Sequence, residues 1–282
     1  MSKNLVTRII VAAIAIPVIL WISYQGGTWL AGMVLLLALL AISEFLVNEG
    51  YRASSCLFWF GLAIAGLMVA RFHIFGYSLW YMFVFGGPVF VLIIMLFVGM
   101  AFATGRRPPD ELFRGYVRFV WGVLYIGLLY PYVYLVGADH IGVAVAASGG
   151  DWLLFLFGLL WVGDTAAMGF GKWLGRRKLA PAVSPNKTVA GFVGGIAGAL
   201  AIGVVMYFWK FRDLEWYHVL ILAALCSVFG QLGDLVESMW KRSLNIKDSS
   251  SIIPGHGGVL DRFDSLLFAA PAMFFYRLIF LT

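Results

Sequence analysis

Long apolar runs separated by short charged clusters dominate the chain. Nine of these runs approach or reach the length that a helix needs to cross a hydrocarbon layer about 30 Å thick. The expected spans are 9–24, 28–47, 56–70, 79–102, 115–136, 152–171, 189–208, 217–237 and 263–281. The runs are continuous rather than alternating, which disfavours a barrel of strands. The pattern therefore predicts an all-α, polytopic integral membrane protein with about nine transmembrane helices.

Composition excludes an ordinary soluble domain. Of the 282 residues, 62% are apolar and only 12% are charged, whereas soluble domains carry about 25% charged residues. The formal net charge of +6 would suit nucleic-acid binding in a soluble protein, but here the basic residues lie between the spans. Membrane lipid, and no nucleic acid, is the partner that this distribution predicts.

The lysines and arginines also predict the orientation. With nine spans and a cytoplasmic N-terminus, sixteen of the twenty basic residues fall on the cytoplasmic side. The opposite side receives only Arg71, Lys210, Arg212 and Arg277. This asymmetry follows the positive-inside rule. We therefore expect a multi-pass protein of the cell inner (cytoplasmic) membrane with its N-terminus in the cytoplasm.

Polar residues are unevenly distributed between the two halves. They enter the spans mainly after Trp152, and the first half consists mostly of apolar runs and short turns. We expect residues 1–150 to form lipid-facing or dimerising helices, so a homodimer is an open alternative. Residues 151–282 are expected to form the catalytic transmembrane region.

Five carboxylates lie close to the ends of apolar runs. Asp234 and Glu237 are three residues apart and share one helix face, and Asp261 and Asp264 do the same at the start of the last span. Asp164 follows another apolar run. A carboxylate at the bilayer centre costs about 2.5–3.5 kcal/mol on insertion scales, and less near the interface. These acids therefore indicate a polar cavity at one rim of the membrane.

Acids brought together in this way repel unless cations or protons neutralise them. Oxygen ligands combined with a phosphate-bearing substrate suit Mg²⁺, and a second cation is an open alternative. A purely structural alternative is that basic neighbours pair with the acids and hold the two helices together. The candidates for that role are Lys241, Arg242 and Arg262.

Two polar loops carry candidate phosphate-binding residues. The loop from Lys247 and Asp248 to His256 ends in several glycines, which can turn backbone N–H groups toward an anion. His256 is a candidate phosphate donor or acid. The second loop places Ser184 and Lys187 just before a span, where helix N-terminal amides favour a phosphate.

The chain resembles the phosphatidate cytidylyltransferases, also called CDP-diacylglycerol synthases. The resemblance rests on a signature of about 27 residues that contains the blocks Ser238-Met239-Trp240-Lys241-Arg242, Lys247-Asp248, Ile253-Pro254-Gly255-His256-Gly257-Gly258 and Leu260-Asp261-Arg262-Phe263-Asp264-Ser265. Upstream blocks at 163–165, 178–181, 184–188 and 233–238 extend it, so that it covers about the last 130 residues. Trp240, Ser250, Ser251, Val189 and Ala190 depart from the usual pattern, and none of these departures removes a carboxylate or lysine of the motif. Val189-Ala190 replaces a frequent Trp-Glu pair, which loses an aromatic and an acidic residue after Thr188.

The resemblance implies a Mg²⁺-dependent reaction of phosphatidate with CTP that gives CDP-diacylglycerol and pyrophosphate at the cytoplasmic interface. Asp234 and Asp261 match acidic positions that the family marks as metal ligands, with Glu237, Asp264 and Asp164 as further candidates. The expected substrate contacts are Ser184, Lys187, Lys241, Arg242 and Arg262. The remaining candidates for catalysis are Lys247, Asp248 and His256.

Two alternatives from other functional classes remain open. A CTP-dependent lipid kinase would use similar groups but would transfer the γ-phosphoryl group. An ion-coupled transporter also carries intramembrane acids and glycine-broken helices, although its charges are expected near the midplane. The nature of the nucleotide product distinguishes these functions.

Overall fold

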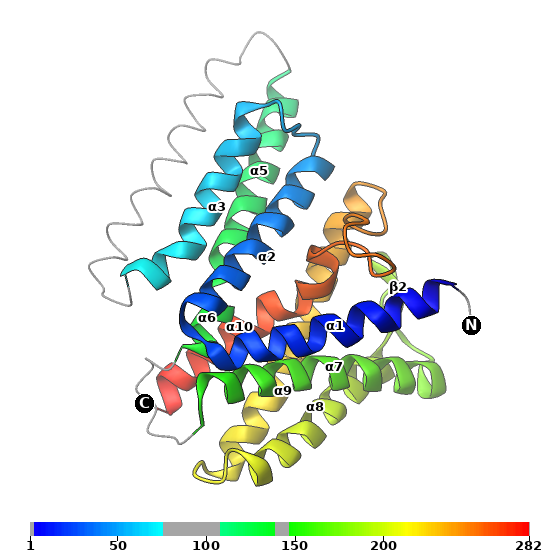
Figure 1. The fold of residues 1–282 in the computed structure, drawn as a ribbon. Helices are drawn as coiled ribbons and strands as arrows, with labels where there is room; N and C mark the ends of the chain where they lie inside the picture. Colours follow the sequence, from blue (N-terminus) through cyan, green and yellow to red (C-terminus); the bar gives the residue numbers. More distant parts are fainter. Residues whose placement is uncertain (1–2, 76–107, 139–146, 282) are drawn as a thin grey trace. The chain divides into compact units, whose positions relative to one another are not determined.

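The computed structural model describes residues 3–75, 108–138 and 147–281, and most of these residues are helical (Figure 1). Eight spans in this part of the chain are long and apolar enough to cross a membrane. The helices are α1 (Lys3–Gln25), α2 (Gly27–Asn48), α3 (Cys56–Phe75), α5 (Pro109–Leu129), α6 (Pro131–Gly137), α7 (Gly149–Leu174), α8 (Val189–Trp209), α9 (Trp216–Ser243) and α10 (Leu260–Phe280).

Eight of the nine predicted spans coincide with these helices, which confirms the all-α membrane class. The ninth, expected at 79–102, lies outside the described residues. The span expected at 115–136 is divided into α5 and α6 at Pro131, a residue without a backbone N–H to continue a helix. The total of nine helices and the cytoplasmic N-terminus stay predictions.

The chain forms two compact units, and residues 31–131 make up one of them. Within this unit α3 packs on α5. The close approach depends on Gly61, because a Cβ added there would lie 3.1 Å from the Phe119 ring. An ion pair of 3.5 Å between Arg118 and Glu49 and the hydrogen bond from Tyr51 to the Gly115 carbonyl join the helix ends.

The other unit contains residues 1–30 and 132–282. Its centre is α7, which packs against α1, α8, α9 and α10 (Figure 1). A capping box of Ser148 and Asp151 starts α7. Glycines on α8 allow close contact with α7: a Cβ on Gly198 would lie 2.6 Å from that of Ala166. The packing of α1 on α7 means that the first span belongs structurally with the region where we expect the chemistry.

The neighbouring helices α9 and α10 bring the predicted acids together. At Gly233 a Cβ would lie 2.5 Å from the Asp264 carbonyl oxygen, so only glycine permits this approach of the two backbones. Asp234 and Glu237 at the end of α9 therefore lie beside Asp261 and Asp264 at the start of α10.

This unit has a different set of contacts at each end. At one end, Arg8 of α1 meets the loop before α10, since its Nε donates to the Gly255 carbonyl at 2.7 Å. At the other end, Asp151 accepts a hydrogen bond from Tyr24 and forms an ion pair with Lys210, each at 3.0 Å. The strands β1 (Lys178–Ala180) and β2 (Ser184–Thr188) pair antiparallel and connect α7 to α8 at the Arg8 end.

Candidate functional site

Lys241 lies between two buried carboxylates. Its Nζ is 2.6 Å from Glu237 Oε2 and 2.7 Å from Asp261 Oδ1. The Glu237 side chain is 0% exposed and that of Asp261 is 3% exposed. Four residues separate Glu237 from Lys241, so both lie on the same face of α9, and Lys241 reaches from there to α10. The ammonium group thus joins the two helices through two charged contacts in a weakly hydrated place.

Asp261 also holds the loop that precedes α10. Its Oδ2 accepts hydrogen bonds from the Ser249 N–H at 2.8 Å, the Ser249 hydroxyl at 3.0 Å and the Gly258 N–H at 2.8 Å. With Lys241 on Oδ1, the carboxylate receives four donors, which is about its full capacity. Two backbone N–H groups of the glycine-rich loop therefore bind this carboxylate in the structure.

Asp234 is more accessible than the other acids of α9. Its Oδ2 lies 2.6 Å from Lys187 Nζ, its Oδ1 accepts a hydrogen bond from Ser238 at 3.2 Å, and one third of its side chain is exposed. Lys187 is placed by β2, which ends where Thr188 caps α8 by accepting from the Gly191 N–H. A basic residue from the hairpin thus meets an acid from α9.

We refer to Asp164, Asp234, Glu237, Asp261 and Asp264 as the acidic cluster. Asp164 interacts electrostatically with Asp234, Asp264 interacts with both of them, and Glu237 interacts with Asp264 and Asp261. Lys187 and Lys241 are in ion pairs with these acids, and Arg262 acts on Asp164 over a longer range. Five carboxylates therefore face three basic groups, and the acids of the cluster act on one another.

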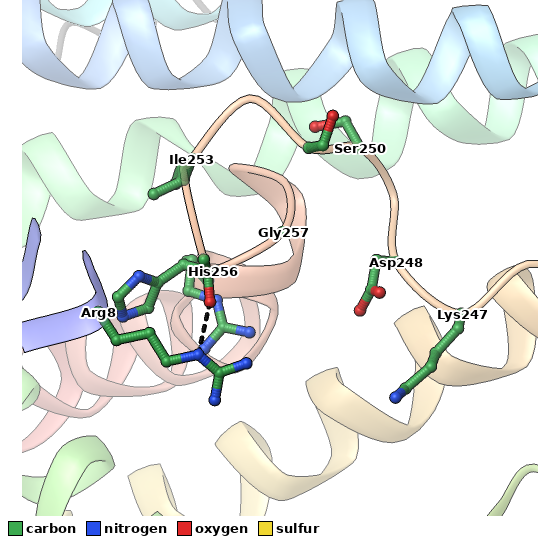
Figure 2. Close-up of a pocket in the computed structure, with 10 residues that line it drawn as sticks. Arg8, Lys247, Asp248, Ser250, Ile253, His256 and Gly257 are labelled. Atoms are coloured by element: carbon green, nitrogen blue, oxygen red, sulfur yellow. Dashed lines mark hydrogen bonds between the residues drawn. The ribbon is translucent and has the colours of Figure 1, made fainter. Parts of the chain in front are cut away.

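A basic pocket of about 530 Å³ lies under the glycine-rich loop, and we call it the loop pocket. Figure 2 shows Arg8 beside His256 on one side and Lys247 on the other. Arg262 also lines this pocket. The left-handed backbone of Gly255 and Gly257 shapes the loop around it, with φ of 73° and 88°.

A second pocket of about 600 Å³, the hairpin pocket, lies between α7, β2, α8 and α9. Asp164 and Asp234 line it together with Lys187. The amide side chains of Asn186 and Gln231 are also at its surface. This pocket combines carboxylates, two lysines (Lys172 and Lys187) and neutral hydrogen-bonding groups.

Most of the predicted site residues come together at this end of the unit. Lys247, Asp248, His256 and Arg262 line the loop pocket, whereas Asp164, Asp234 and Lys187 line the hairpin pocket. Lys241 lines neither of these two pockets. It pairs with Glu237 and Asp261, which is the structural alternative that the sequence left open.

Two candidate residues take other places. Arg242 donates to the backbone carbonyls of Val183 and Ile246 and forms no ion pair with a described acid. Ser184 begins β2, where it pairs with Ala180, and it lines neither of the two pockets. Their predicted contact with substrate stays a prediction.

Sequence reasoning missed Arg8, Asn186 and Gln231. Arg8 is 247 positions from its partner Gly255, and in the sequence it is one of several basic residues that the positive-inside rule already explains. Asn186 lies within the motif block 184–188, in which Ser184 and Lys187 carried the phosphate-binding prediction. Gln231 lies three residues before Asp234, on the same face of α9, and this spacing was the signal that could have identified it.

The residues present are compatible with a hard cation. The Oε1 atom of Glu237 is buried and finds no hydrogen-bond partner among the described residues, and the five acids of the cluster outnumber the basic groups that act on them. No group of three His, Cys, Asp or Glu side chains is arranged to hold an ion within 3–75, 108–138 and 147–281. Mg²⁺ commonly uses one or two carboxylates with waters and substrate phosphates, and the hairpin pocket presents two carboxylates, Asp164 and Asp234.

Comparison with known proteins places the chain in a class. The cytidylyltransferase family matches residues 6–280, so the chain belongs to this family. The match covers both compact units.

Individual relatives carry a more specific name. The phosphatidate cytidylyltransferase of Staphylococcus haemolyticus is 35% identical over 267 residues, which cover 94% of this chain and 96% of the relative. The protein of that name from Staphylococcus epidermidis is 34% identical over 271 residues, with the same coverage. A third, from Staphylococcus saprophyticus, is 42% identical over 151 residues, 54% of this chain and 55% of the relative. The resemblance inferred from the motifs is thereby confirmed.

Proposed function

We propose that the chain transfers the cytidylyl group of CTP to phosphatidate, giving CDP-diacylglycerol and pyrophosphate. One observation carries the proposal. The chain belongs to the cytidylyltransferase family, and its acidic cluster, with Lys187 and Lys241, adjoins the loop pocket and the hairpin pocket. Nothing in the comparisons favours a lipid kinase or a transporter.

The reaction needs no nucleophilic side chain. A phosphate oxygen of phosphatidate attacks the α-phosphorus of CTP, and the bond from that phosphorus to the oxygen bridging to the β-phosphate breaks. Pyrophosphate leaves with the electron pair of that bond. Two polyanions must approach each other, so positioning and charge neutralisation provide most of the catalysis.

The basic residues hold the anions for this step. Lys187 is one quarter exposed at the hairpin pocket, and Lys247 and Arg262 are exposed at the loop pocket. Charge-assisted hydrogen bonds from such groups to phosphate oxygens are shorter and stronger than neutral ones. Lys241 and Asp261 fix the loop and the ends of α9 and α10, and so keep these groups in position.

We also propose that Mg²⁺ is the cofactor, held by Asp234 and Asp164. Asp261 would join them only if the metal replaced the Lys241 ammonium at Oδ1. When bound, the ion would neutralise phosphate charge and assist departure of pyrophosphate. Glu237 and Asp264 lie beside these groups, near the end of α9 and the start of α10.

We propose further that this end of the unit faces the cytoplasm in the inner membrane. The basic residues Arg8, Lys187 and Lys247 all lie at this end, whereas Lys210 lies at the other end beside Asp151. The positive-inside rule supports that orientation. Water-soluble CTP and membrane-bound phosphatidate can both reach a site there.

The nucleotide products test the proposed reaction. Purified protein in detergent, supplied with CTP, Mg²⁺ and phosphatidate, should release pyrophosphate in a 1:1 ratio to CTP consumed and should release no CDP. Both products are measured by ion-exchange chromatography, with phosphatidate omitted as the control. Release of CDP in place of pyrophosphate would show phosphoryl transfer and overturn the proposal.

A further inference from the structure

A third pocket, of about 400 Å³, runs along α1, and we call it the α1 groove. Its apolar walls come from α1 on one side and from α7 and α10 on the other. The α1 residues that line it are Val11, Ala12, Ala15, Ile16 and Ile19. From α7 come Phe157, Leu160 and Trp161. Its size lies within the range of about 300–1,000 Å³ that is usual for small-molecule sites.

One end of the α1 groove is charged. Arg262 and His256 line both this groove and the loop pocket, and Asp164 lines both this groove and the hairpin pocket. The groove therefore opens at its polar end onto both of the pockets already described. A molecule that fits it must be apolar over most of its length and must carry at one end a polar group that meets Arg262 and His256 beside the carboxylates of Asp164, Asp261 and Asp264.

The spacing along α1 shows how the groove is made. Ala12, Ala15 and Ile19 follow one another at intervals of three and four residues, so they lie on one face of the helix. Two alanines on this face leave room that larger side chains would fill. Ala13 and Ile14, on another face of the same turn, are exposed. The sequence of α1 thus distinguishes a face that forms a wall from a face that does not.

The length of this wall is most of the depth of one leaflet of a bilayer. The α1 residues that line the groove run from Val11 to Ile19, and Arg8, whose Nε is bound to the Gly255 carbonyl, lies just before them at the loop pocket. At 1.5 Å per residue the wall is about 12 Å long, compared with about 15 Å for half of a hydrocarbon core of about 30 Å. An acyl chain extending from a head group at the membrane surface has this reach.

We propose that the α1 groove binds one acyl chain of phosphatidate and places the phosphate of that lipid at Arg262 and His256. The proposal rests on the proposed function and assigns the lipid subsite to α1, a helix outside the signature region. Arg262 and His256 can meet the phosphate on the side of the loop pocket, which Arg8 also lines, whereas Asp164, Asp261 and Asp264 line the same end of the groove on the side of the acidic cluster. From that position the lipid phosphate lies beside both pockets where CTP phosphates can be held.

The test fills the groove without touching the charged residues. In Ala15→Phe, the new ring occupies space on the wall face of α1 that the acyl chain needs. The KM for dioleoyl phosphatidate should therefore rise about tenfold. The KM for CTP should stay within twofold of the wild-type value. Ala13→Phe adds the same ring to the exposed face and serves as the matched control, with both constants unchanged.

Two outcomes would overturn the proposal. One is an unchanged KM for phosphatidate in Ala15→Phe, and the other is an equal rise in the KM values for CTP and phosphatidate. Ala12→Leu, a smaller change on the same wall, gives the same test if Ala15→Phe does not fold. A wild-type protein without transferase activity would contradict the proposed function instead, so the two failures are distinguishable.

Discussion

Lys241→Met is expected to abolish activity and to lower the thermal midpoint of unfolding by about 10 °C. The substitution removes the cation shared by two enclosed carboxylates, Glu237 and Asp261. Removing one partner of a buried ion pair typically costs about 3–5 kcal/mol, and each kcal/mol corresponds to about 2–4 °C in a domain of 150–250 residues. Activity is expected to disappear because the ammonium group no longer joins Glu237 of α9 to Asp261 of α10, and so no longer fixes the ends of the two helices that carry the acidic cluster.

Controls can separate this effect from the general loss of a positive charge. Lys178→Met changes an exposed lysine on β1 and should leave the midpoint unchanged. The double variant Glu237→Gln/Lys241→Met removes one of the two unpaired charges, so it should unfold at a higher temperature than Lys241→Met alone. Unfolding is followed by intrinsic fluorescence in detergent. A midpoint for Lys241→Met within 2 °C of the wild type would show that the pairing does not stabilise the fold.

Asp234→Asn is expected to lower kcat by at least 100-fold with little change in stability. Its carboxylate is one third exposed at the hairpin pocket, and asparagine still presents an oxygen to Lys187 Nζ, which the carboxylate contacts at 2.6 Å. Removal of one group that stabilises charge in a transition state commonly costs a factor of about 10²–10³ in kcat. Asparagine keeps the size of the side chain and an oxygen that can accept from Ser238.

The matched control for this substitution is Asp213→Asn. Asp213 is an exposed acid between α8 and α9, close to the end of the unit that carries Lys210. Steady-state rates at saturating CTP and phosphatidate should therefore be unchanged in this control. A wild-type kcat in Asp234→Asn would remove Asp234 from the mechanism and would redirect the metal proposal to other acids.

The membrane spans could be predicted because their signal is local. An apolar run of sufficient length specifies a transmembrane helix almost regardless of the rest of the chain. The spacing of Asp234 and Glu237, and of Asp261 and Asp264, likewise predicted two acidic faces, and the structure places them side by side on α9 and α10. Helical periodicity within a single element was sufficient for these inferences.

The roles of individual charges could not be predicted in this way. Lys241, Arg242 and Arg262 are near one another in sequence, but Lys241 is enclosed between two acids, Arg242 binds backbone carbonyls and Arg262 lines a pocket. Which role each side chain takes depends on which neighbouring helix it faces. That information lies in the packing of α9 against α10 and not in the residue type.

The participation of α1 depends on contacts that are even more distant in sequence. Arg8 and the wall residues of the α1 groove meet groups more than 100 positions away. In the sequence, the first apolar run is indistinguishable from a lipid-facing anchor. The packing of α1 against α7 in the compact unit is therefore a structural finding that no local pattern contained.

The most direct test of the account is to follow the α-phosphate of CTP into the lipid. Wild-type protein in detergent, given Mg²⁺, phosphatidate and CTP labelled at the α-phosphate, should yield a labelled lipid that co-migrates with CDP-diacylglycerol. CTP labelled at the γ-phosphate should leave the lipid unlabelled. Label from the γ-phosphate in the lipid, or intact CTP in the presence of folded protein, would contradict the assignment of cytidylyl transfer to this site.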